Sequence, residues 1–541
     1  MPDWWWKLLL AAVMVQMPFE LRYEFFGLSN LQWAFVALTF ASAPVILKNR
    51  TRLIDDRLIQ AAALFVAVQW LTACMAPEFH TNAIKAAVRF TVGFILLVII
   101  RASGSERLST KLWVVASSLA AVYALVAYAG LGSPGLFRTT EFYIGQVRRL
   151  SGSFEYPNTA AAYFAMSLPI VWWSSFGVRQ RSAAAFALWA AIILTFSKGA
   201  LLAVPIVAFA VGPEHWKKAV GLLGIGAIAY VLLLPLNPYV LERIYGSAAW
   251  HPIAAEYSVP WNDLREQTGR TDSVPLAIRN TGMDTWPSVG LGRVSVGSRW
   301  WDMDSETFMD IAPVVTTLDR NVGRGETIEV PAAFRTPDKP GHYLLVLGLF
   351  SRNFDWFSPR GVVPMLIRTD IAVNLERSTR VSDLSALYRH GQGPTMLTAT
   401  VPRQSLWKAA LKMFIAHPFG VGPDNYRLEY GKYLDAVRWD THVYSNNLYW
   451  EILTGSGVLG LLAFLLLLAS RRWGSDAASL STGIFLVHGV VDVFLMTTPI
   501  YFAFWMLLGW RANDSIDPDR RFSFIERAGV RNASVPAALS N

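Results

Sequence analysis

The sequence is poor in charged residues and nearly free of cysteine. Only 16% of its 541 residues are Asp, Glu, Lys or Arg, whereas soluble domains carry about 25%. The single cysteine, Cys74, excludes an intrachain disulfide and a metal cluster held by several thiolates. A secretory signal peptide is not indicated either, because Trp4, Trp5 and Trp6 stand where a basic segment is expected. We interpret these tryptophans as an interfacial anchor, which favours a membrane protein.

Long apolar runs support the same class. Hydrophobic residues make up 53% of the chain and gather into runs close to the roughly 20 residues that cross a bilayer. The predicted spans are 5–18, 30–47, 58–76, 84–100, 112–130, 158–177, 183–196, 199–212, 219–236, 447–469, 476–496 and 499–511. The predicted fold is an all-α polytopic membrane protein of about twelve transmembrane helices, interrupted by one hydrophilic insertion.

Basic residues predict the orientation of these spans. Lys and Arg are concentrated in alternate short loops, which is the pattern of cytoplasmic loops. The clusters are Lys48 to Arg57, Arg101 to Lys111, Arg179 with Arg181, Lys217 with Lys218, and Arg471 with Arg472. Both termini then lie inside and the insertion lies outside. Topology explains the net charge of +9, so no nucleic-acid partner is indicated.

The insertion contains a segment with the pattern of β structure. Residues 274–375 alternate β-branched and aromatic runs with turn-forming residues, which predicts an antiparallel sandwich. The predicted strands are Val274–Asn280, Leu291–Trp301, Glu326–Arg335, Gly341–Phe350 and Val363–Val373. Asn280-Thr281-Gly282, Trp286-Pro287 and Gly341-His342-Tyr343 resemble the immunoglobulin-like domains often appended to extracellular enzymes.

These patterns divide the chain into six parts. The predicted parts are helices one to nine at 1–236, a linker at 237–273, the sandwich at 274–375, an outer loop at 376–446, helices ten to twelve at 447–512, and a cytoplasmic tail at 513–541. The outer loop includes Ser405–Ala416, an amphipathic stretch too short to span. We expect it to lie at the outer membrane interface.

Four cations on the outer side depart from the charge rule. Arg148, Arg149, Lys198 and Arg403 stand at predicted outer loops or junctions. Cations near the membrane surface suit a bound phosphate or pyrophosphate, which arginine grips with two parallel hydrogen bonds. The alternative is that each side chain reaches to lipid headgroups.

A histidine in the outer loop is the candidate base. His442 lies just before the tenth span, and Asp440 is close enough in sequence to influence it. His488 and Asp492 are four residues apart in the eleventh span, so a continuous helix would place them on one face. That pair is either functional or a structural hydrogen-bonded pair.

Several short motifs follow one another along the apolar parts of the chain. They are Ser151-Gly152-Ser153-Phe154 with Pro157-Asn158, Thr195-Phe196-Ser197-Lys198-Gly199-Ala200, Leu406-Trp407 through His417-Pro418-Phe419-Gly420-Val421-Gly422-Pro423, and Asn447-Leu448-Tyr449 with Gly455, Gly457 and Leu459-Gly460. In order, spacing and sidedness they resemble the O-antigen ligase and polymerase superfamily over about 85–235 and 400–500. His488 and Asp492 also have counterparts there.

The resemblance implies a membrane glycosyltransferase of the C type. Such an enzyme moves a glycan from a polyprenyl diphosphate to an acceptor hydroxyl, with inversion and without a metal or other cofactor. Its partners are the lipid-linked donor, the hydroxyl of a lipid, glycan or protein, and the bilayer. The reaction takes place on the periplasmic side of the bacterial inner membrane. By position, the diphosphate-binding residues are Arg148 or Arg149, Lys198 and Arg403; the base is His442; the supporting residues are Asp440, Asn447, His488 and Asp492.

Two positions depart from the family pattern. Lys198 stands where the family usually has arginine, which keeps the charge and loses the two-pronged grip. Asn446 stands where the family histidine commonly precedes Asn447, and His442 lies five residues before Asn447. Either a loop of different length brings His442 to the same point, or the base is another residue.

Two other functions remain open at this level. A transporter or flippase of the same lipid-linked glycan would also use many spans, but the insertion divides the spans nine to three and the two parts show no repeat. A non-catalytic scaffold could recruit partners through the sandwich. Sequence does not choose between ligation and polymerisation or identify the sugar.

Overall fold

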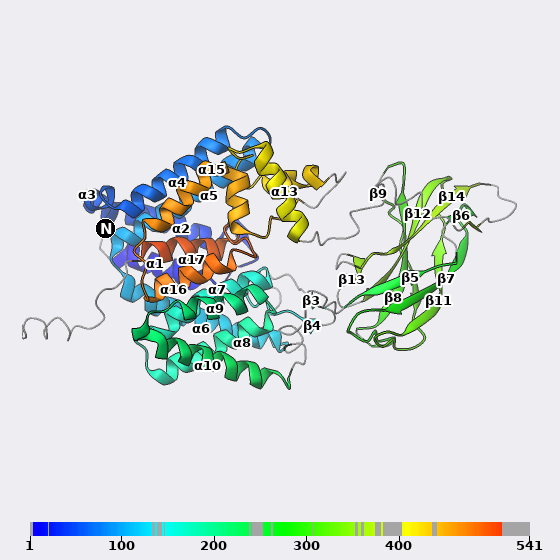
Figure 1. The fold of residues 1–541 in the computed structure, drawn as a ribbon, viewed down its shortest axis with the longest axis horizontal. Helices are drawn as coiled ribbons and strands as arrows, with labels where there is room; N and C mark the ends of the chain where they lie inside the picture. The colour runs from blue at the N-terminus through cyan, green and yellow to red at the C-terminus, as the bar shows by residue number, and fades with distance from the viewer. Residues whose placement is uncertain are drawn as a thin grey trace, which may run out of the picture.

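The computed structural model places a bundle of helices beside a β-sandwich, as Figure 1 shows. It describes residues 4–19, 21–131, 136–137, 143–144, 147–236, 240, 253–260, 263–290, 292–305, 307–351, 355–358, 362–373, 380–381, 403–434 and 441–510. Asp440 lies outside these residues, as do the predicted tail and most of 374–402.

Every predicted span contains a helix. The helices are α1 (Trp4–Gln16), α2 (Asn30–Lys48), α3 (Arg50–Ile54), α4 (Arg57–Cys74), α5 (His80–Ser103), α6 (Glu106–Tyr128), α7 (Pro157–Trp172), α8 (Val178–Leu194), α9 (Lys198–Phe209), η1 (Pro213–His215), α10 (Trp216–Leu233), α13 (Arg403–Ala416), α14 (Tyr426–Glu429), η4 (Tyr430–Leu434), α15 (Leu448–Ala469), α16 (Ala477–His488) and α17 (Thr498–Gly509). Among the described residues, six helical segments are long and apolar enough to cross a membrane, and α9, α16 and α17 are shorter apolar helices. A membrane protein is therefore supported, and twelve crossings stay a prediction.

Helix α7 forms the centre of the bundle. All its residues except Asn158 and Trp172 are buried, because alanines and apolar side chains cover its whole circumference. Helices α6, α8, α16 and α17 pack around it. Pro157 occupies the first turn, where a missing N–H costs no hydrogen bond, and Asn158 follows at the exposed rim. This position brings the Asn158 amide to one end of the bundle.

Helix α15 is broken near its middle, and the loop before α14 packs against the break. Gly457 has φ +66°, and the Val458 N–H donates to the carbonyl of Pro418. The N–H groups of Val421 and Gly422 donate to the carbonyls of Thr454 and Gly455. The Gly-rich motif at 418–423 is thus a backbone joint that positions α13 and α14 against α15.

Two sheets form the sandwich. The strands are β5 (Ala255–Ser258), β6 (Asp263–Gln267), β7 (Thr271–Asn280), β8 (Val294–Asp302), β9 (Thr307–Phe308), β10 (Val314–Thr317), β11 (Thr327–Arg335), β12 (Gly341–Ser351), β13 (Asp355–Trp356), β14 (Met365–Ala372) and β15 (Arg380–Val381). The larger sheet has the order β10-β8-β12-β14-β6-β15, with β9 and β13 at its sides, and the smaller has the order β11-β7-β5. Apolar side chains of both sheets share one core. Strands β5 and β6 extend the sandwich ahead of residue 274, and β6 runs parallel to β14.

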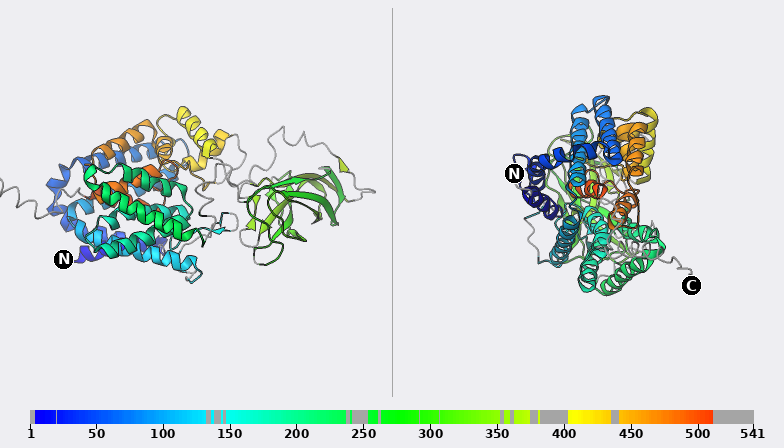
Figure 2. Two further views of the ribbon diagram at one scale, coloured as in Figure 1. Left: turned by 60° about the horizontal axis from the view of Figure 1, so that its bottom comes forward. Right: turned by 90° about the vertical axis from the view of Figure 1, so that its left-hand side faces the viewer.

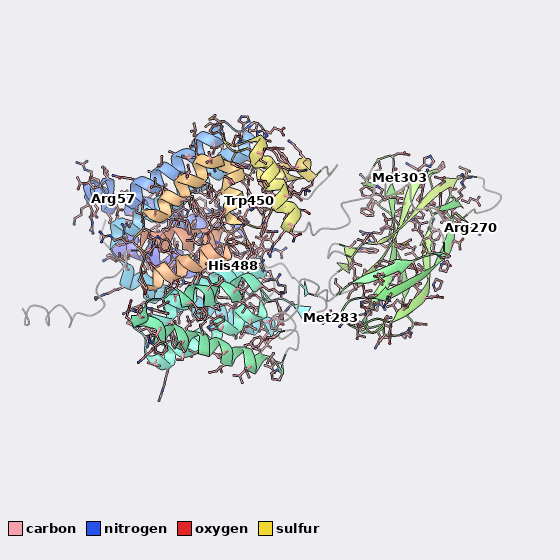
Figure 3. The ribbon with its side chains drawn as sticks, in the orientation of Figure 1. Arg57, Arg270, Met283, Met303, Trp450 and His488 are labelled. Carbon is pink, nitrogen blue, oxygen red and sulfur yellow. The ribbon has the colours of Figure 1, made fainter. Side chains whose placement is uncertain are left out.

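The bundle has two distinct ends. Figure 3 places Arg57 at the end remote from the sandwich and places Trp450 and His488 nearer to it. The small hairpin of β3 (Tyr143–Ile144) and β4 (Val147–Arg148) also lies at the sandwich end, as does α13. The left view of Figure 2 shows the bundle and the sandwich side by side from a further direction. We call this the sandwich end; the sequence predicts that it faces outward.

Candidate active site

Arg149 occupies the sandwich end of the bundle between α7 and α8. Its Nε donates to the carbonyl of Thr195 at 2.7 Å, and one terminal nitrogen donates to Oδ1 of Asn158 at 2.7 Å. The Leu150 N–H also donates to the carbonyl of Leu194. These bonds hold a half-buried guanidinium in one orientation at the bundle rim.

Asn158 joins Arg149 to Asp492 across the bundle. Its Nδ2 donates to Oδ2 of Asp492 at 2.7 Å, while its Oδ1 accepts from Arg149. An amide suits this place because it offers an acceptor to the cation and a donor to the carboxylate. Asp492 also accepts from the N–H of Val493. The three residues form one polar chain at the sandwich end.

His488 and Asp492 do not share a helical face. Helix α16 ends at His488, and Asp492 lies in the turn before α17, because Gly489 ends the helix and the chain turns toward Pro499. Nε2 of His488 lies 3.5 Å from Oγ of Ser197, so His488 contacts the start of α9 rather than Asp492. The expectation of one shared face was wrong because the helix is shorter than the apolar run.

Lys198 stands at the same end as the first residue of α9. It follows Phe196, which has a positive φ of 54°, and Ser197, which lies against His488. A Cβ on Gly199 would lie 2.5 Å from the His488 ring, so the start of α9 packs tightly on that ring. Lys198 therefore flanks the contact between α9 and α16.

Arg403 begins α13 and faces the same polar chain. It lies within electrostatic range of His488 and of Asp492. With Arg149 and Lys198, it gives three cations around the 488–492 turn. Arg148 has a different environment: it donates to the carbonyls of Ala127 and Tyr128 at 2.8 and 2.7 Å and stacks over the Tyr128 ring. Arg148 thus caps α6, and Arg149 is the member of the pair that joins the cluster.

Helix α13 begins two residues before the predicted stretch and ends where predicted, directly before His417. The apolar residues at helical spacing that suggested an amphipathic helix are Leu406, Trp407, Ala410, Leu411 and Phe414. Of these, Leu406 and Ala410 are buried, and they pack together with Ala409 and Met413 against Val421, Tyr426 and Tyr430. Leu411 and Ile415 remain exposed beside Lys408 and Lys412. Part of the predicted apolar side therefore packs on the protein, and Leu411 with Ile415 forms the apolar surface that α13 leaves exposed.

His442 is exposed on a short irregular segment at 441–447 that is anchored from several sides. The carbonyl of Thr441 accepts from Arg427 at 3.0 Å, and the carbonyl of Ser445 accepts from Nε1 of Trp407 at 3.1 Å. Nδ2 of Asn447 donates to the carbonyl of Val490 at 2.8 Å. The segment therefore lies between α13, α14 and the turn that holds Asp492.

A second polar cluster lies on the other side of this segment. Arg427 donates to both carboxylate oxygens of Asp424 and to Oδ1 of Asn82. Burial lowers the pKa of Arg427, but its bonds to Asp424 outweigh burial and the pKa is raised. Burial also raises the pKa of Tyr444, whose ring lies 6.0 Å from the guanidinium. Arg427 is thus a fixed cation that holds the segment in place.

Strained backbone marks the same region. Positive φ values occur at Phe79, Phe196, Asp424 and Asn446, which flank the two polar clusters and the 441–447 segment. Such conformations are uncommon for residues other than glycine and persist where surrounding contacts impose them. Their concentration at one end of the bundle favours a functional site there.

Several members of this region were not predicted as site residues. They are Asn158, Arg427, Glu451 and Arg89, which lies 5.0 Å over the Tyr501 ring. Arg89 and Glu451 stand inside predicted spans, and an ionisable residue within a span is itself a signal of function. Asn158 and Arg427 become recognisable only through partners far away in the sequence.

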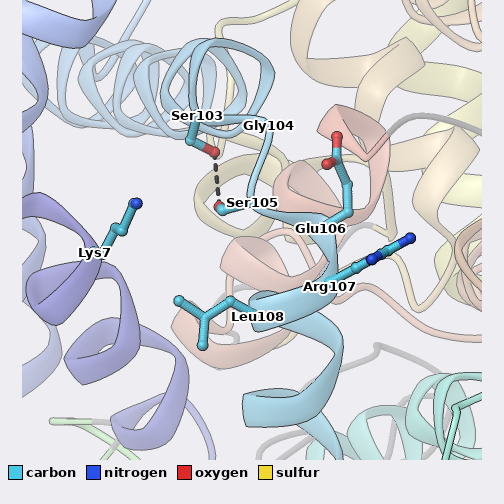
Figure 4. A pocket seen from close by; sticks show the side chains of 7 residues that line it. All are labelled: Lys7, Ser103, Gly104, Ser105, Glu106, Arg107 and Leu108. Atoms are coloured by element: carbon cyan, nitrogen blue, oxygen red, sulfur yellow. Dashed lines mark hydrogen bonds between the residues drawn. The ribbon is translucent and has the colours of Figure 1, made fainter. Parts of the chain in front are cut away.

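A cavity at the opposite end has a different character. Figure 4 shows it between the start of α1 and the turn joining α5 to α6. Its volume is about 390 Å³. Lys7, Glu106 and Arg107 line it, and Ser103 and Ser105 are hydrogen-bonded at 2.9 Å.

The described residues contain no group of three or more His, Cys, Asp or Glu side chains arranged to hold a metal ion.

Comparison with known proteins gives one family match, and it covers segments at the sandwich end of the bundle. A family model described as O-antigen ligase matches residues 361–465, from β14 into α15. No curated protein matches the chain. Among solved structures, the Pseudomonas fluorescens alkylpurine DNA glycosylase AlkC bound to DNA containing an abasic site analog aligns at 12% identity over 58% of this chain and 97% of that chain, with a TM-score of 0.17. The family match spans α13, the 441–447 segment and most of α15, and it supports the resemblance to the O-antigen ligase superfamily that the sequence motifs predict.

Proposed function

We propose that the sandwich end transfers a glycan from a polyprenyl diphosphate, of the undecaprenyl type, to an acceptor hydroxyl on the periplasmic side of a bacterial inner membrane. The match of residues 361–465 to the O-antigen ligase family model supports membrane glycosyl transfer in general. The observation that supports this particular site is the polar chain of Arg149, Asn158 and Asp492 with Arg403 beside it. This site holds fixed cations at the predicted outer membrane interface, which is where the diphosphate of a lipid-linked donor would lie.

The cations have a direct role in this reaction. When the bond between the anomeric carbon and the diphosphate oxygen breaks, negative charge grows on the leaving diphosphate. Preorganised cations stabilise that charge more in the transition state than in the bound donor. We assign this role to Arg149, Lys198 and Arg403. Arg149 has its orientation fixed by Thr195 and Asn158, so it loses little freedom when the donor binds.

The acceptor side uses the 441–447 segment. His442 takes the proton of the acceptor hydroxyl, and the oxygen attacks the anomeric carbon opposite the departing diphosphate, which gives inversion. Neither a nucleotide sugar nor a metal ion is part of this scheme. Asn447 supports the segment through Val490, and Asp492 supports Arg149 through Asn158.

A gene-deletion strain tests the function. We expect loss of long glycan chains from an otherwise complete acceptor if the protein is a ligase, and acceptors capped with a single repeat if it is a polymerase. Unchanged glycans would contradict the proposal. Complementation with His442→Ala should fail, whereas His342→Ala, which changes an exposed histidine of the sandwich, should restore the wild-type glycan profile. Equal complementation by both variants would favour a transporter over an enzyme.

A further inference from the structure

Glu451 is a buried carboxylate at the start of α15 that no step above uses. Its side chain lies beside the 441–447 segment, and the residue is 5% exposed. Oε2 accepts from the N–H of Ser445 at 3.1 Å and from its hydroxyl at 2.7 Å. In the described part of the chain, Oε1 has no hydrogen-bond partner. Burying a carboxylate costs free energy unless hydrogen bonds compensate for the lost solvation, so a buried carboxylate within an apolar span is a candidate for a functional role.

The two bonds fix a part of the segment that has no secondary structure of its own. Asn447 caps α15 by accepting from the N–H groups of Tyr449 and Trp450. Glu451 reaches back over this cap to Ser445, so the chain folds sharply between them. Asn446 lies at that fold with a positive φ of 52°. The strained conformation is thus held from both sides.

Ser445 has two further anchors, one local and one from a separate helix. Its hydroxyl also lies 2.9 Å from the carbonyl of Asn447. Its carbonyl accepts from Trp407 of α13, the helix that begins with Arg403. Arg427 and Asp424 lie within electrostatic range of Glu451 but are bonded mainly to each other. Glu451 is therefore the side chain of α15 that holds the proposed base segment, while Trp407 ties the segment to the helix carrying a proposed donor-binding cation.

We propose that Glu451 is a positioning residue for glycan transfer, which holds the 441–447 segment at the reaction centre through Ser445. This inference rests on the proposed function. Removing the carboxylate should release the segment and lower kcat, while the KM for the donor should stay unchanged because the cations at the 488–492 turn are intact. Since the residue transfers no proton itself, the pH dependence of the rate should keep its shape.

Two substitutions at one position test this role. Glu451→Leu removes the acceptor and should lower kcat about 10- to 100-fold, the effect of losing hydrogen bonds to a charged group. Glu451→Gln keeps an acceptor oxygen and should recover most of that loss. The same changes at Glu429, an equally buried carboxylate whose charged partner is Lys432, should leave kcat near the wild-type value. A Glu451→Gln enzyme as inactive as Glu451→Leu, or with a shifted pH profile, would overturn the proposal.

Hydrogen exchange separates this inference from the proposed function. In the detergent-solubilised full chain, Glu451→Leu and Ser445→Ala should each speed exchange of the amides at 441–447, and the double change should add little. Unchanged exchange would overturn the positioning role whether or not the protein transfers glycans. Faster exchange in the two variants, together with no glycan product from the wild-type protein, would instead contradict the proposed function alone. If Glu451→Leu does not fold, Ser445→Ala and Glu451→Gln carry the test.

Discussion

The helical bundle and the β-sandwich differ in how they hold their backbone. In the described residues, each positive φ at a residue other than glycine lies in the bundle, and four of the five positions surround the sandwich end. The sandwich instead has long regular ladders, such as β11 against β7 over nine paired residues. Its Asp302-Met303-Asp304 turn is closed by Asp302 Oδ1, which accepts from Asp304 and Ser305. Strain and fixed cations thus gather where we propose chemistry, and the sandwich provides a stable surface.

The largest expected effect in this comparison is at Arg149. Arg149→Ala should lower the transfer rate about 100- to 1,000-fold, the scale seen when one preorganised charge stabiliser is removed. Arg149→Lys should recover little, because lysine cannot bond Thr195 and Asn158 and keep a second prong for phosphate. The matched control is Arg320→Ala in the sandwich, which removes an exposed ion pair with Glu326 and should leave the rate unchanged. An equal loss of transfer rate in Arg149→Ala and Arg320→Ala would contradict the proposal that the reacting groups lie in the bundle and not in the sandwich.

The backbone joint between α15 and residues 418–423 should give the next effect. Gly457→Ala would place a Cβ 2.4 Å from the carbonyl carbon of Phe419 at a φ that favours glycine. We expect a loss of at least about 1–3 kcal/mol in stability, measured as a lower unfolding temperature in detergent. Gly224→Ala on α10 is the control, since no atom lies within 4 Å of its added Cβ and alanine favours a helix. A Gly457→Ala protein as stable as Gly224→Ala would mean that the joint is not constrained.

A smaller effect is expected from removing the sandwich. A chain in which a short flexible linker replaces residues 255–372 should lose less than about tenfold in transfer rate, because the proposed reacting groups are in the bundle. The measurement is turnover of the purified protein with intact donor and acceptor, with Arg149→Ala in the same background as the negative control. Complete loss of transfer in a folded deletion variant would favour a scaffold acting through the sandwich.

The smallest effect concerns pH and stability at Glu429. Burial raises the pKa of this carboxyl in the folded protein, with Lys432 acting in the opposite direction. The folded state therefore holds its proton more tightly, so this group destabilises the fold as pH rises above its unfolded value of about 4.3. The side chain of Glu429→Gln cannot ionise. Between about pH 4 and pH 7, the unfolding temperature of this variant should therefore fall less than that of the wild-type protein. A larger fall in the variant than in the wild type would show that the ion pair dominates over burial.

The sequence predicted the positions of helices and strands better than it predicted which residues contact one another. Apolar runs located the helices, and strands β7, β8, β11, β12 and β14 fall close to their predicted positions because side chains alternate in chemistry along them. The end of α16 was missed because the apolar run continues past Gly489, where only the backbone turns. Hydropathy does not report such a turn.

The candidate site was predictable only in part. The outer cations could be singled out because they depart from the charge rule. The structure groups Arg149, Lys198 and Arg403 near one turn, whereas Arg148 caps α6. The bond of Asn158 to Asp492 joins residues far apart in the chain, and neither residue carries a local signal of the other. Glu451 could have been singled out as a carboxylate within an apolar span, but its partner Ser445 depends on the fold of the segment before α15.

The most direct test is transfer by the purified protein in proteoliposomes. These would contain labelled polyprenyl-diphosphate glycan and, as the acceptor source, the lipid and glycan extract of a gene-deletion strain. We expect release of polyprenyl diphosphate in step with labelled product, loss of both with Arg149→Ala, and retention of both with Arg320→Ala. Movement of the donor across the membrane without release of diphosphate, or equal release by the wild type and Arg149→Ala, would contradict glycan transfer at the sandwich end.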